Sequence, residues 1–216
     1  GTALYRSWVA DLPQHTEMWA IQLPGREMRF REPLIRDFSV LVREISAEIA
    51  PYTAQPFVFF GHSMGAVLGY DVARQIEHEQ LRCLVVSGYR APHLPRRHTP
   101  MHDMPHDQWM NALRKMGGTP EDILQDPAIM QLIEPTIRTD MYLSETYQYH
   151  ASTTLACPLY VLGGEADYLV NEDELRQWRE HTNGDFQLNM MTGDHFFIKQ
   201  SAFVRMLASI FERSQN

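Results

Sequence analysis

The run Phe57-Val58-Phe59-Phe60-Gly61-His62-Ser63-Met64-Gly65 decides the fold of this chain. Its first four residues are apolar, as in a buried strand, and the residues after Ser63 have the pattern of a helix. A strand, a sharp turn and a helix with a serine at the apex form the context of a nucleophile elbow. We expect a side chain at Gly61 or at Gly65 to crowd the neighbouring strand or helix. Ser63 is therefore a candidate nucleophile.

Strand and helix patterns alternate around this turn. A helix is expected around Leu4 to Asp11, a strand around Met18 to Leu23, and a longer helix from Phe38 to Tyr52. Strands are then expected at 57–61, 82–87, 158–163 and 186–191, and helices at 64–79, 171–182 and 197–213. Such alternation predicts a parallel sheet with helices on both faces. The fold class is α/β, in a single domain over residues 1–216.

The alternation stops between Ser87 and Ala156, where no strand pattern occurs. Glycine and proline divide this stretch into short helical pieces, expected at 105–116, 127–133 and 136–149. We predict that residues 92–154 are a helical lid over the ends of the strands. The segment is rich in methionine, which suits either a pocket for varied apolar chains or the filling of gaps between lid helices. Its methionines are Met101, Met104, Met110, Met116, Met130 and Met141.

A serine hydroxyl needs a base before it can attack, and His195 is the predicted base. This histidine directly follows the apolar strand that ends near Met191, so it should lie at the carboxyl edge of the sheet, where Ser63 is also presented. His62 is the alternative. Because neighbouring residues on a sharp turn point apart, we expect His62 to pack or to form a hydrogen bond beside the elbow.

A buried carboxylate must hold the imidazole in one tautomer, and Asp167 is predicted for this role. It follows the 158–163 strand, which gives the chain order Ser, Asp, His found in α/β-hydrolases. Three other carboxylates compete. Glu165 lies too close to the strand end, Asp173 begins a helix, and Asp194 more plausibly shapes the histidine loop.

The backbone N–H of Met64 is predicted to stabilise the oxyanion of the tetrahedral intermediate. A second donor normally comes from a loop after an early strand, and the chain begins Gly1-Thr2-Ala3 with no strand before it. We expect the first strand and part of the oxyanion loop to lie beyond the amino terminus of the given sequence.

Composition excludes several other functions. The 216 residues carry a formal charge of −8, which argues against a nucleic-acid partner. The apolar runs have the length of strands, and no charged-then-apolar leader opens the chain, so we expect a cytoplasmic protein without a membrane role. Cys83 and Cys157 lie in apolar runs and are expected to be free thiols. No ligand spacing for a metal site occurs.

Six segments together resemble the type II thioesterases, the stand-alone hydrolases that accompany nonribosomal peptide and polyketide synthetases. The serine elbow alone occurs in many esterases, so the combination carries the resemblance, which covers essentially the whole chain. The segments are Leu23-Pro24-Gly25-Arg26-Glu27, Arg31-Glu32-Pro33, Phe60-Gly61-His62-Ser63-Met64-Gly65, Ser87-Gly88-Tyr89-Arg90-Ala91-Pro92-His93, Gly117-Gly118-Thr119-Pro120 and Gly193-Asp194-His195-Phe196-Phe197.

The resemblance implies an α/β-hydrolase fold and an enzyme that removes stalled or wrong acyl groups from the phosphopantetheine arm of acyl or peptidyl carrier proteins. It implies Ser63, Asp167 and His195 as nucleophile, acid and base, and no cofactor of its own, because the partner carries the arm. A medium-chain fatty acyl-carrier-protein thioesterase and a general carboxylesterase are the alternatives. A binding module without catalysis is less well supported, because all three triad positions hold competent residues.

The segment from Arg90 to His98 is locally basic in an acidic chain. Its position between the 82–87 strand and the lid places it near the mouth of the expected pocket. Arg96 and Arg97 are therefore candidates for contact with the phosphate of the arm or with an acidic carrier surface. A solvated loop without a partner is the other interpretation of this charge run.

Overall fold

A computed structural model describes residues 1–14, 16–76 and 79–214. Within these residues one sheet forms, with four parallel strands in chain order. The strands are β1 (Phe57–His62), β2 (Leu81–Ser87), β3 (Leu159–Gly164) and β4 (Phe186–Met191). Their register pairs Phe60 with Val85 and Val86 with Val161. All four carboxyl ends therefore meet at one edge of the sheet, as the alternation of strands and helices predicts.

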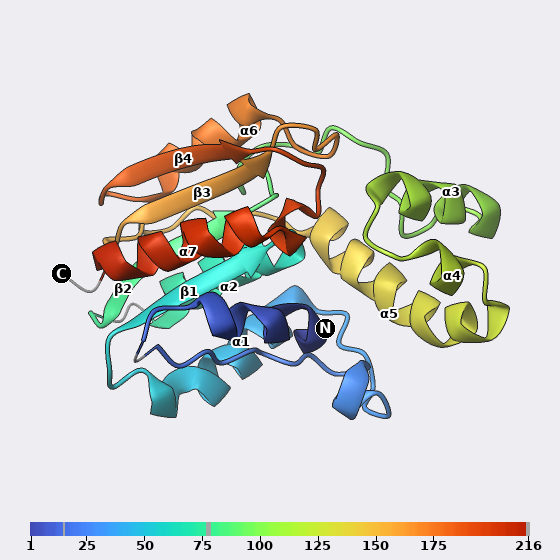
Figure 1. Cartoon of the computed structure of the whole chain (residues 1–216), viewed down its shortest axis with the longest axis horizontal. Coiled ribbons are helices and arrows are strands. Elements are labelled where there is room, and N and C mark those ends of the chain that lie inside the picture. The colour runs from blue at the N-terminus through green and yellow to red at the C-terminus, as the bar shows by residue number, and fades with distance from the viewer. Residues whose placement is uncertain (15, 77–78, 215–216) are drawn as a thin grey trace.

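Helices cover both faces of the sheet. In β2, Leu84 and Val86 pack toward α2 (Met64–Ile76), whereas Cys83 and Val85 pack toward α7 (Ser201–Ser214). This alternation follows from the two-residue period of a strand. Figure 1 shows α7 in front of the sheet and α2 behind it. Because both faces of the inner strands β2 and β3 are buried, these strands are largely apolar, whereas the edge strand β4 includes Gln187 and Asn189.

Two further elements complete the layers. The helix α1 (Phe38–Ile49) packs on α2 and begins at Asp37, whose carboxylate accepts from the backbone N–H groups of Ser39 and Val40. This is a regular N-cap. On the opposite side of the sheet, the 3-10 helix η1 (Thr2–Asp11) inserts Trp8 into the cluster beneath α7. The predicted helix over 38–52 ends as the 3-10 turn η3 (Ala50–Tyr52).

The helices α3 (His106–Met116), α4 (Glu121–Leu124) and α5 (Pro127–Thr146) form a separate group beyond the carboxyl edge of the sheet (Figure 1). They have a hydrophobic cluster of their own, centred on Trp109. The glycine that follows α3, Gly117, has a φ of +78° and ends the helix in the left-handed conformation.

The predicted break between 133 and 136 is wrong, because Pro135 lies inside the continuous helix α5. A proline removes one intrahelical hydrogen bond and costs about 3 kcal/mol or more. However, α5 buries Met130 before the proline and Met141 and Leu143 after it. Each such side chain contributes roughly 1.5 to 3 kcal/mol on burial, so packing on both sides outweighs the break.

The predicted strand from Met18 to Leu23 is also absent, since this segment is extended chain with no strand partner among the described residues. The carbonyl of Gln22 instead accepts from the guanidinium of Arg29 at 2.8 Å. Two predicted helices are divided in the structure. The first is α6 (Glu172–Arg176) followed by η4 (Gln177–His181), and the second is η5 (Phe197–Lys199) followed by α7. The end of the 64–79 helix falls partly outside the described residues.

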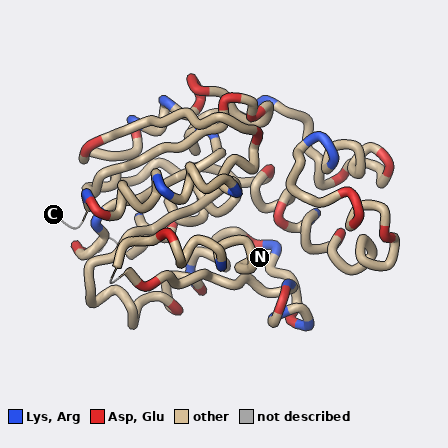
Figure 2. Tube along the Cα trace, viewed as in Figure 1, with Lys and Arg blue, Asp and Glu red and all other residues tan. Residues whose placement is uncertain are grey.

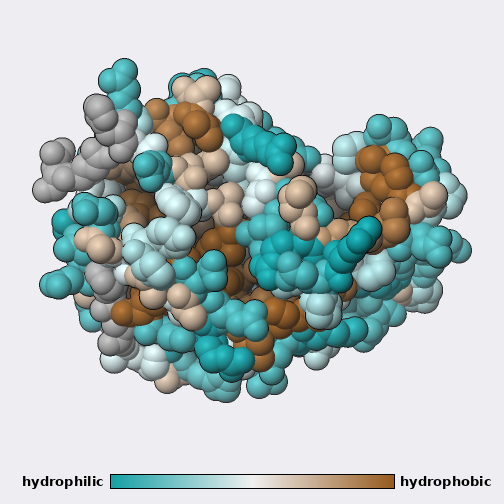
Figure 3. Space-filling model, turned by 90° about the horizontal axis from the view of Figure 1, so that it is seen from below, coloured by the Kyte–Doolittle hydropathy of each residue, from teal (hydrophilic) through white to brown (hydrophobic). Residues whose placement is uncertain are grey.

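Charges of both signs are interspersed along the chain (Figure 2), and the face seen from below shows apolar patches separated by hydrophilic surface (Figure 3). No helix among the described residues is long and apolar enough to cross a bilayer. Cys83 and Cys157 are both free, as predicted. Burial raises the pKa of the Cys83 thiol to about 12 and that of Cys157 to about 11, so both thiols stay protonated.

Candidate active site

Ser63 occupies a strained turn between β1 and α2. Its φ is +53°, and its backbone N–H donates to the carbonyl of Ser87 at 2.8 Å. This left-handed conformation costs a non-glycine residue about 1 to 2 kcal/mol. A Cβ on Gly61 would overlap the carbonyl of Gly65, whereas a Cβ on Gly65 would meet nothing within 4 Å. The steric explanation for two glycines is therefore right for Gly61 and wrong for Gly65.

His195 lies within hydrogen-bond distance of both predicted partners. Its Nε2 is 3.1 Å from Oγ of Ser63, and its Nδ1 is 2.7 Å from Oδ2 of Asp167. The His195 residue is only 3% exposed. With the Nδ1 proton donated to the carboxylate, Nε2 presents its lone pair to the serine hydroxyl. The arrangement has the order and the distances of a catalytic triad.

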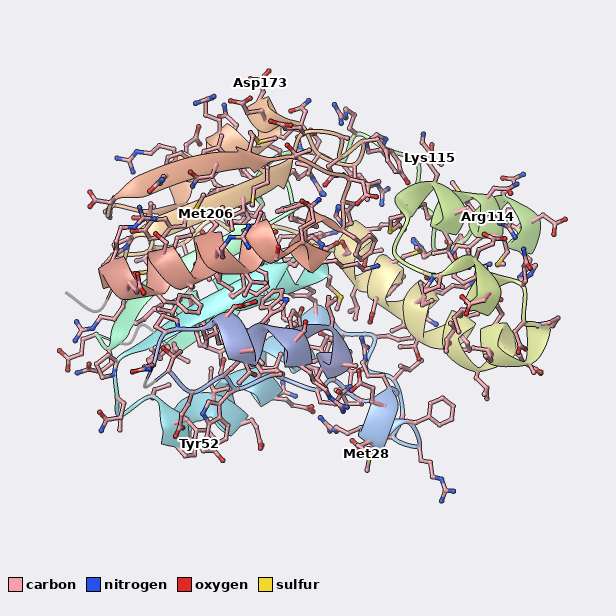
Figure 4. The ribbon with its side chains drawn as sticks, in the orientation of Figure 1. Met28, Tyr52, Arg114, Lys115, Asp173 and Met206 are labelled. Carbon is pink, nitrogen blue, oxygen red and sulfur yellow. The ribbon has the colours of Figure 1, made fainter. Side chains whose placement is uncertain are left out.

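Asp167 is the carboxylate that reaches the imidazole, and the competing acids do not. Its other oxygen, Oδ1, accepts from the backbone N–H of Leu169 at 2.9 Å, which fixes the carboxylate plane. Glu165 is exposed and accepts from Thr192, and Asp194 caps the turn after the strand by accepting from the backbone N–H of Phe196 at 2.8 Å. Asp173 is exposed on α6 and points away from the molecule in Figure 4.

The loops that carry the acid and the base are joined to each other. The N–H of Glu165 donates to the carbonyl of Met191 at 2.8 Å, and the N–H of Ala166 donates to the carbonyl of Gly193 at 2.9 Å. A Cβ on Gly164 would lie 2.5 Å from the carbonyl oxygen of Asp194, so glycine is needed for this close approach. The spacing between acid and base is thus set by backbone contacts.

Comparison with known proteins identifies the family. The thioesterase domain family matches residues 1–214 of this chain. The chain belongs to the thioesterase family. The gramicidin S biosynthesis protein GrsT of Aneurinibacillus migulanus is 36% identical over 206 residues, which is 94% of this chain and 80% of GrsT. This thioesterase is a thioester hydrolase of α/β-hydrolase fold.

Two solved structures extend the comparison over the whole chain. ClbQ from the colibactin NRPS/PKS pathway superimposes with a TM-score of 0.92 at 28% identity, covering 100% of this thioesterase and 93% of ClbQ. The type II thioesterase BorB from the borrelidin biosynthetic cluster gives a TM-score of 0.89 at 31% identity. The match covers 100% of this thioesterase and 88% of BorB. The insertion between β2 and β3 is therefore included in the likeness.

His62 of this thioesterase packs against the imidazole of His195, a contact that the sequence did not specify. The ring centroids of His62 and His195 are 4.8 Å apart, and Nδ1 of His62 lies 3.0 Å from Oγ of Ser87. Nε2 of His62 is buried without a hydrogen-bond partner among the described residues. Burial, followed by the nearby His195, holds the pKa of His62 well below its usual value, so the ring is neutral. His62 thus packs beside the elbow, as expected.

Gly88 makes room for the two rings. Its φ is +61°, and a Cβ there would lie 2.8 Å from Cε1 of His62 and 3.3 Å from Cε1 of His195. Sequence reasoning did not assign a role to Ser87 or Gly88. The available signal was their position directly after the second apolar strand, at the carboxyl edge where the site forms.

Met64 is the first residue of α2, so its backbone N–H is one of the four amides that find no partner inside the helix. The positive end of the helix dipole lies at the same place and favours an oxyanion. The assignment of Met64 as an oxyanion donor stays a prediction, as does the second donor. Gly1 and the residues after it lie beside Glu27, whose carboxylate accepts from the backbone N–H of Ala3 at 3.1 Å.

The methionines of the insertion and the arginines of the basic segment both have contacts within this thioesterase. The six methionines of the 92–154 segment belong to the segment's own hydrophobic cluster, which favours gap filling over pocket lining. Arg96 donates to the carbonyl of Glu145 at 2.9 Å, and Arg97 lies 3.5 Å from the Glu174 carboxylate. Both guanidinium groups therefore have partners within the protein, and Arg96 is a structural residue of the insertion.

Proposed function

We propose that this thioesterase hydrolyses acyl groups from the phosphopantetheine arms of carrier proteins and so edits a nonribosomal peptide or polyketide assembly line. The observation that carries the proposal is the contact of His195 with both Ser63 and Asp167, in a chain of the thioesterase family. The pathways named for GrsT, ClbQ and BorB support the substrate class. The compartment is proposed to be the cytoplasm, where such synthetases would be met.

In the proposed mechanism, Oγ of Ser63 attacks the thioester carbonyl while its proton passes to Nε2 of His195. The tetrahedral oxyanion is stabilised by the Met64 N–H, and its collapse breaks the C–S bond. His195 returns the proton to the departing thiolate, which leaves as the free pantetheine thiol. Asp167 keeps the imidazole in the required tautomer and stabilises the imidazolium.

A water molecule completes the proposed cycle. His195 removes a proton from this water, which attacks the acyl-serine ester, and the second tetrahedral intermediate collapses to the free acid and the serine hydroxyl. A thiol is much more acidic than an alcohol, so a thiolate leaves with little help from an acid. A single histidine therefore suffices for both halves of the reaction.

The decisive variant is Ser63→Ala. We expect it to lose all measurable hydrolysis of acyl-carrier thioesters and all labelling by a fluorophosphonate, while its circular dichroism and melting temperature stay close to those of the parent. The substitution should change backbone strain little, because alanine at this positive φ is strained as serine is. Ser39→Ala on α1 is the matched control and should label fully. Parent-like turnover by Ser63→Ala would refute the nucleophile assignment.

Substrate profiles separate this function from the two alternatives. An enzyme that edits assembly lines should accept short and varied acyl groups on a carrier protein. A medium-chain fatty acyl-carrier-protein thioesterase should instead show a sharp optimum at intermediate chain length. A general carboxylesterase should prefer oxygen esters to the matching thioesters. We would measure kcat/KM for one series of acyl groups, each presented as a carrier-protein thioester, as a small thioester and as an oxygen ester. The three profiles decide among the functions.

We also propose that residues 92–154 act as the lid of this enzyme. The turn after α3 supports this, because a Cβ on Gly117 would lie 3.0 Å from Oδ2 of Asp194, in the loop that carries His195. Lys199 donates to the carbonyl of Gly118 at 3.1 Å across the same contact. The insertion thus rests directly on the histidine loop.

A further inference from the structure

In the loop that includes the 3-10 turn η2 (Glu27–Arg29), the polar side chains form hydrogen bonds within the protein, whereas two large apolar side chains are exposed. Arg26 forms two hydrogen bonds with the Asp140 carboxylate of α5, at 2.7 and 2.8 Å. Glu27 accepts from the hydroxyl of Thr2 at 2.7 Å, and Arg29 donates to the carbonyl of Gln22 at 2.8 Å. These contacts fix the loop on both the amino-terminal segment and the insertion.

The alternate residues of the same loop are exposed to solvent. Met28 is 95% exposed and Phe30 is 47% exposed. Figure 4 shows Met28 at the outer end of the loop, below α5. A flexible loop could fold such side chains away, but this one is held by the bidentate Arg26 pair. Two large apolar side chains kept in water on a fixed loop are a feature of binding surfaces.

Exposed charges of both signs flank this apolar pair, with Glu27 directly before Met28 and Arg31 directly after Phe30. Arg31 is exposed and forms no ion pair within the described part of the chain, whereas Arg29 is paired with Glu32. Arg36 is exposed a few residues further on, with its guanidinium 4.7 Å from the ring centroid of Tyr142. In a protein of charge −8, an unpaired arginine next to exposed methionine and phenylalanine favours an anionic partner.

The base of the loop shares a hydrophobic cluster with the residue that follows the proposed nucleophile. Leu23 belongs to one hydrophobic cluster with Met64, the residue after Ser63, and with Leu143 of α5. Thr136 of α5 also donates its hydroxyl to the carbonyl of Gly25 at 2.8 Å. The loop therefore stands where the elbow and the insertion meet, on the side of the molecule that faces the insertion (Figure 1).

We propose that Met28, Phe30 and Arg31 form the docking surface for the acyl-carrier protein, at the base of its phosphopantetheine arm. This inference rests on the proposed function and names the surface that the partner contacts. The arm is joined to its carrier through a phosphodiester, so the partner presents a negative charge wherever the arm begins. Arginine binds such a phosphate well, and methionine and phenylalanine supply adaptable apolar contact around it.

A second copy of this chain fits the surface less well. In a symmetric dimer the same patch contacts itself, which would bring Arg31 of each subunit toward the other. Two chains of charge −8 also repel each other over longer distances. The exposed Arg31 of this acidic protein is thus better matched to an anionic group of a partner than to a second Arg31.

The test compares one acyl group on two supports, an acylated carrier protein and free pantetheine. We expect the double variant Met28→Ala/Phe30→Ala and the single variant Arg31→Glu each to lower kcat/KM for the carrier substrate by about tenfold or more, through KM. Activity toward the pantetheine thioester should stay within about twofold of the parent. Val9→Ala and Arg43→Glu, which change exposed residues elsewhere, are the matched controls and should leave the kinetics with both substrates unchanged.

Three results would overturn the docking surface. The first is unchanged kcat/KM for the carrier substrate in both Met28→Ala/Phe30→Ala and Arg31→Glu. The second is an equal loss of kcat/KM for the carrier substrate and for the pantetheine thioester. The third is a loss on the carrier substrate that occurs only in Arg97→Glu, in the basic segment after β2. Light scattering of the Met28→Ala/Phe30→Ala variant adds a check, because a change in oligomeric state with parent-like carrier kinetics would assign the patch to self-association. Failure of the parent enzyme to cleave any carrier-bound acyl group would instead remove the proposed function, and the docking proposal with it.

Discussion

His62 shows how a residue next to the proposed nucleophile in sequence can contact the proposed base. Its ring packs against His195, while its Nδ1 is held by the hydroxyl of Ser87 at 3.0 Å. Because the low pKa keeps His62 neutral, the imidazolium that forms at His195 during the reaction meets no second positive charge. The ring therefore limits the tilt of His195 without opposing its protonation.

Substitution of His62 separates packing from hydrogen bonding. We expect His62→Ala to lower kcat by roughly tenfold to a hundredfold with little change in KM, because His195 can then tilt away from Ser63. His62→Phe, which keeps a ring and loses the hydrogen bond, should recover most of the activity, whereas His62→Asn should not. Steady-state kinetics with a small thioester measures all three. Parent-like kcat in His62→Ala would show that the ring has no positioning role.

At this scale the sequence predicts well which three side chains meet, and predicts their surroundings poorly. Ser63, Asp167 and His195 each follow a recognisable apolar strand, so the order of strand ends is enough to bring them together. The contact between His62 and His195 depends on the positive φ of Gly88 and on ring orientation. Neither property has a signature in a single sequence.

The turn after α3 is the element through which the insertion contacts the site. A Cβ on Gly118 would overlap the ring of Phe196, and that ring lies edge-on to His195 with centroids 5.2 Å apart. The ammonium of Lys199 lies 4.9 Å from the centroid of the same ring. A shift of the insertion would therefore move Phe196, and through it His195.

We expect Gly118→Ala to lower kcat several-fold, because the added methyl must displace Phe196 or lift the turn. The double variant Gly118→Ala/Phe196→Leu should be less impaired than the sum of the single variants, since the smaller side chain makes room. Gly69→Ala in α2 is the control, because a Cβ there meets only Leu84 at 3.8 Å. Strictly additive losses in kcat would contradict a steric contact between the two elements.

Elements were predicted best where their apolar pattern is strong. The four strands and α2 have continuous or periodic apolar patterns, and their predicted bounds agree with the structure to within one or two residues where the structure describes them. Pro135 misled the prediction because proline usually ends a helix, and the packing that keeps α5 whole is tertiary. The segment from Met18 to Leu23 has a strand-like sequence, but within the described residues it has no neighbouring strand.

At the scale of the whole molecule, the buried His181 and the partly buried His93 join the two ends of the insertion to the main body. His93 lies near the start of the 92–154 segment and Tyr149 near its end, and both rings pack on His181 of η4. His181 is 2% exposed, with its Nδ1 2.9 Å from the hydroxyl of Tyr70 and its Nε2 2.7 Å from Nδ1 of His93.

Burial, followed by His93 and Arg74, lowers the pKa of His181 from 6.5 to about 4. The unfolded chain therefore binds a proton at this position before the folded protein does. Stability from this residue is complete above about pH 6.5, falls as the pH decreases toward 4, and levels off below that value. The total is roughly 2 to 3 kcal/mol, of which most is lost by pH 5.

The prediction is that His181→Gln, which cannot be protonated, loses about 2 kcal/mol less stability between pH 7 and pH 5 than the parent protein does. Urea unfolding at both pH values gives the free energies of unfolding. His150→Gln, at an exposed position, should follow the parent. Parallel pH dependence of the parent and of His181→Gln would show that the buried histidine does not contribute.

The class and architecture of the whole molecule could be predicted, because the alternation of strands and helices leaves few other folds. The placement of the insertion could not. It depends on single contacts, such as Arg26 with Asp140 and Lys199 with the carbonyl of Gly118, between residues far apart in the chain. A pattern of apolar residues carries no information about which charged side chains will meet.

The long insertion between β2 and β3 also divides the proposed catalytic groups along the chain. Ser63 precedes it, and Asp167 and His195 follow it. A nascent polypeptide emerging from the ribosome thus displays its nucleophile long before the groups that activate it. The contact of His195 with Ser63 and Asp167 therefore forms only after the last strand and its histidine loop have left the exit tunnel.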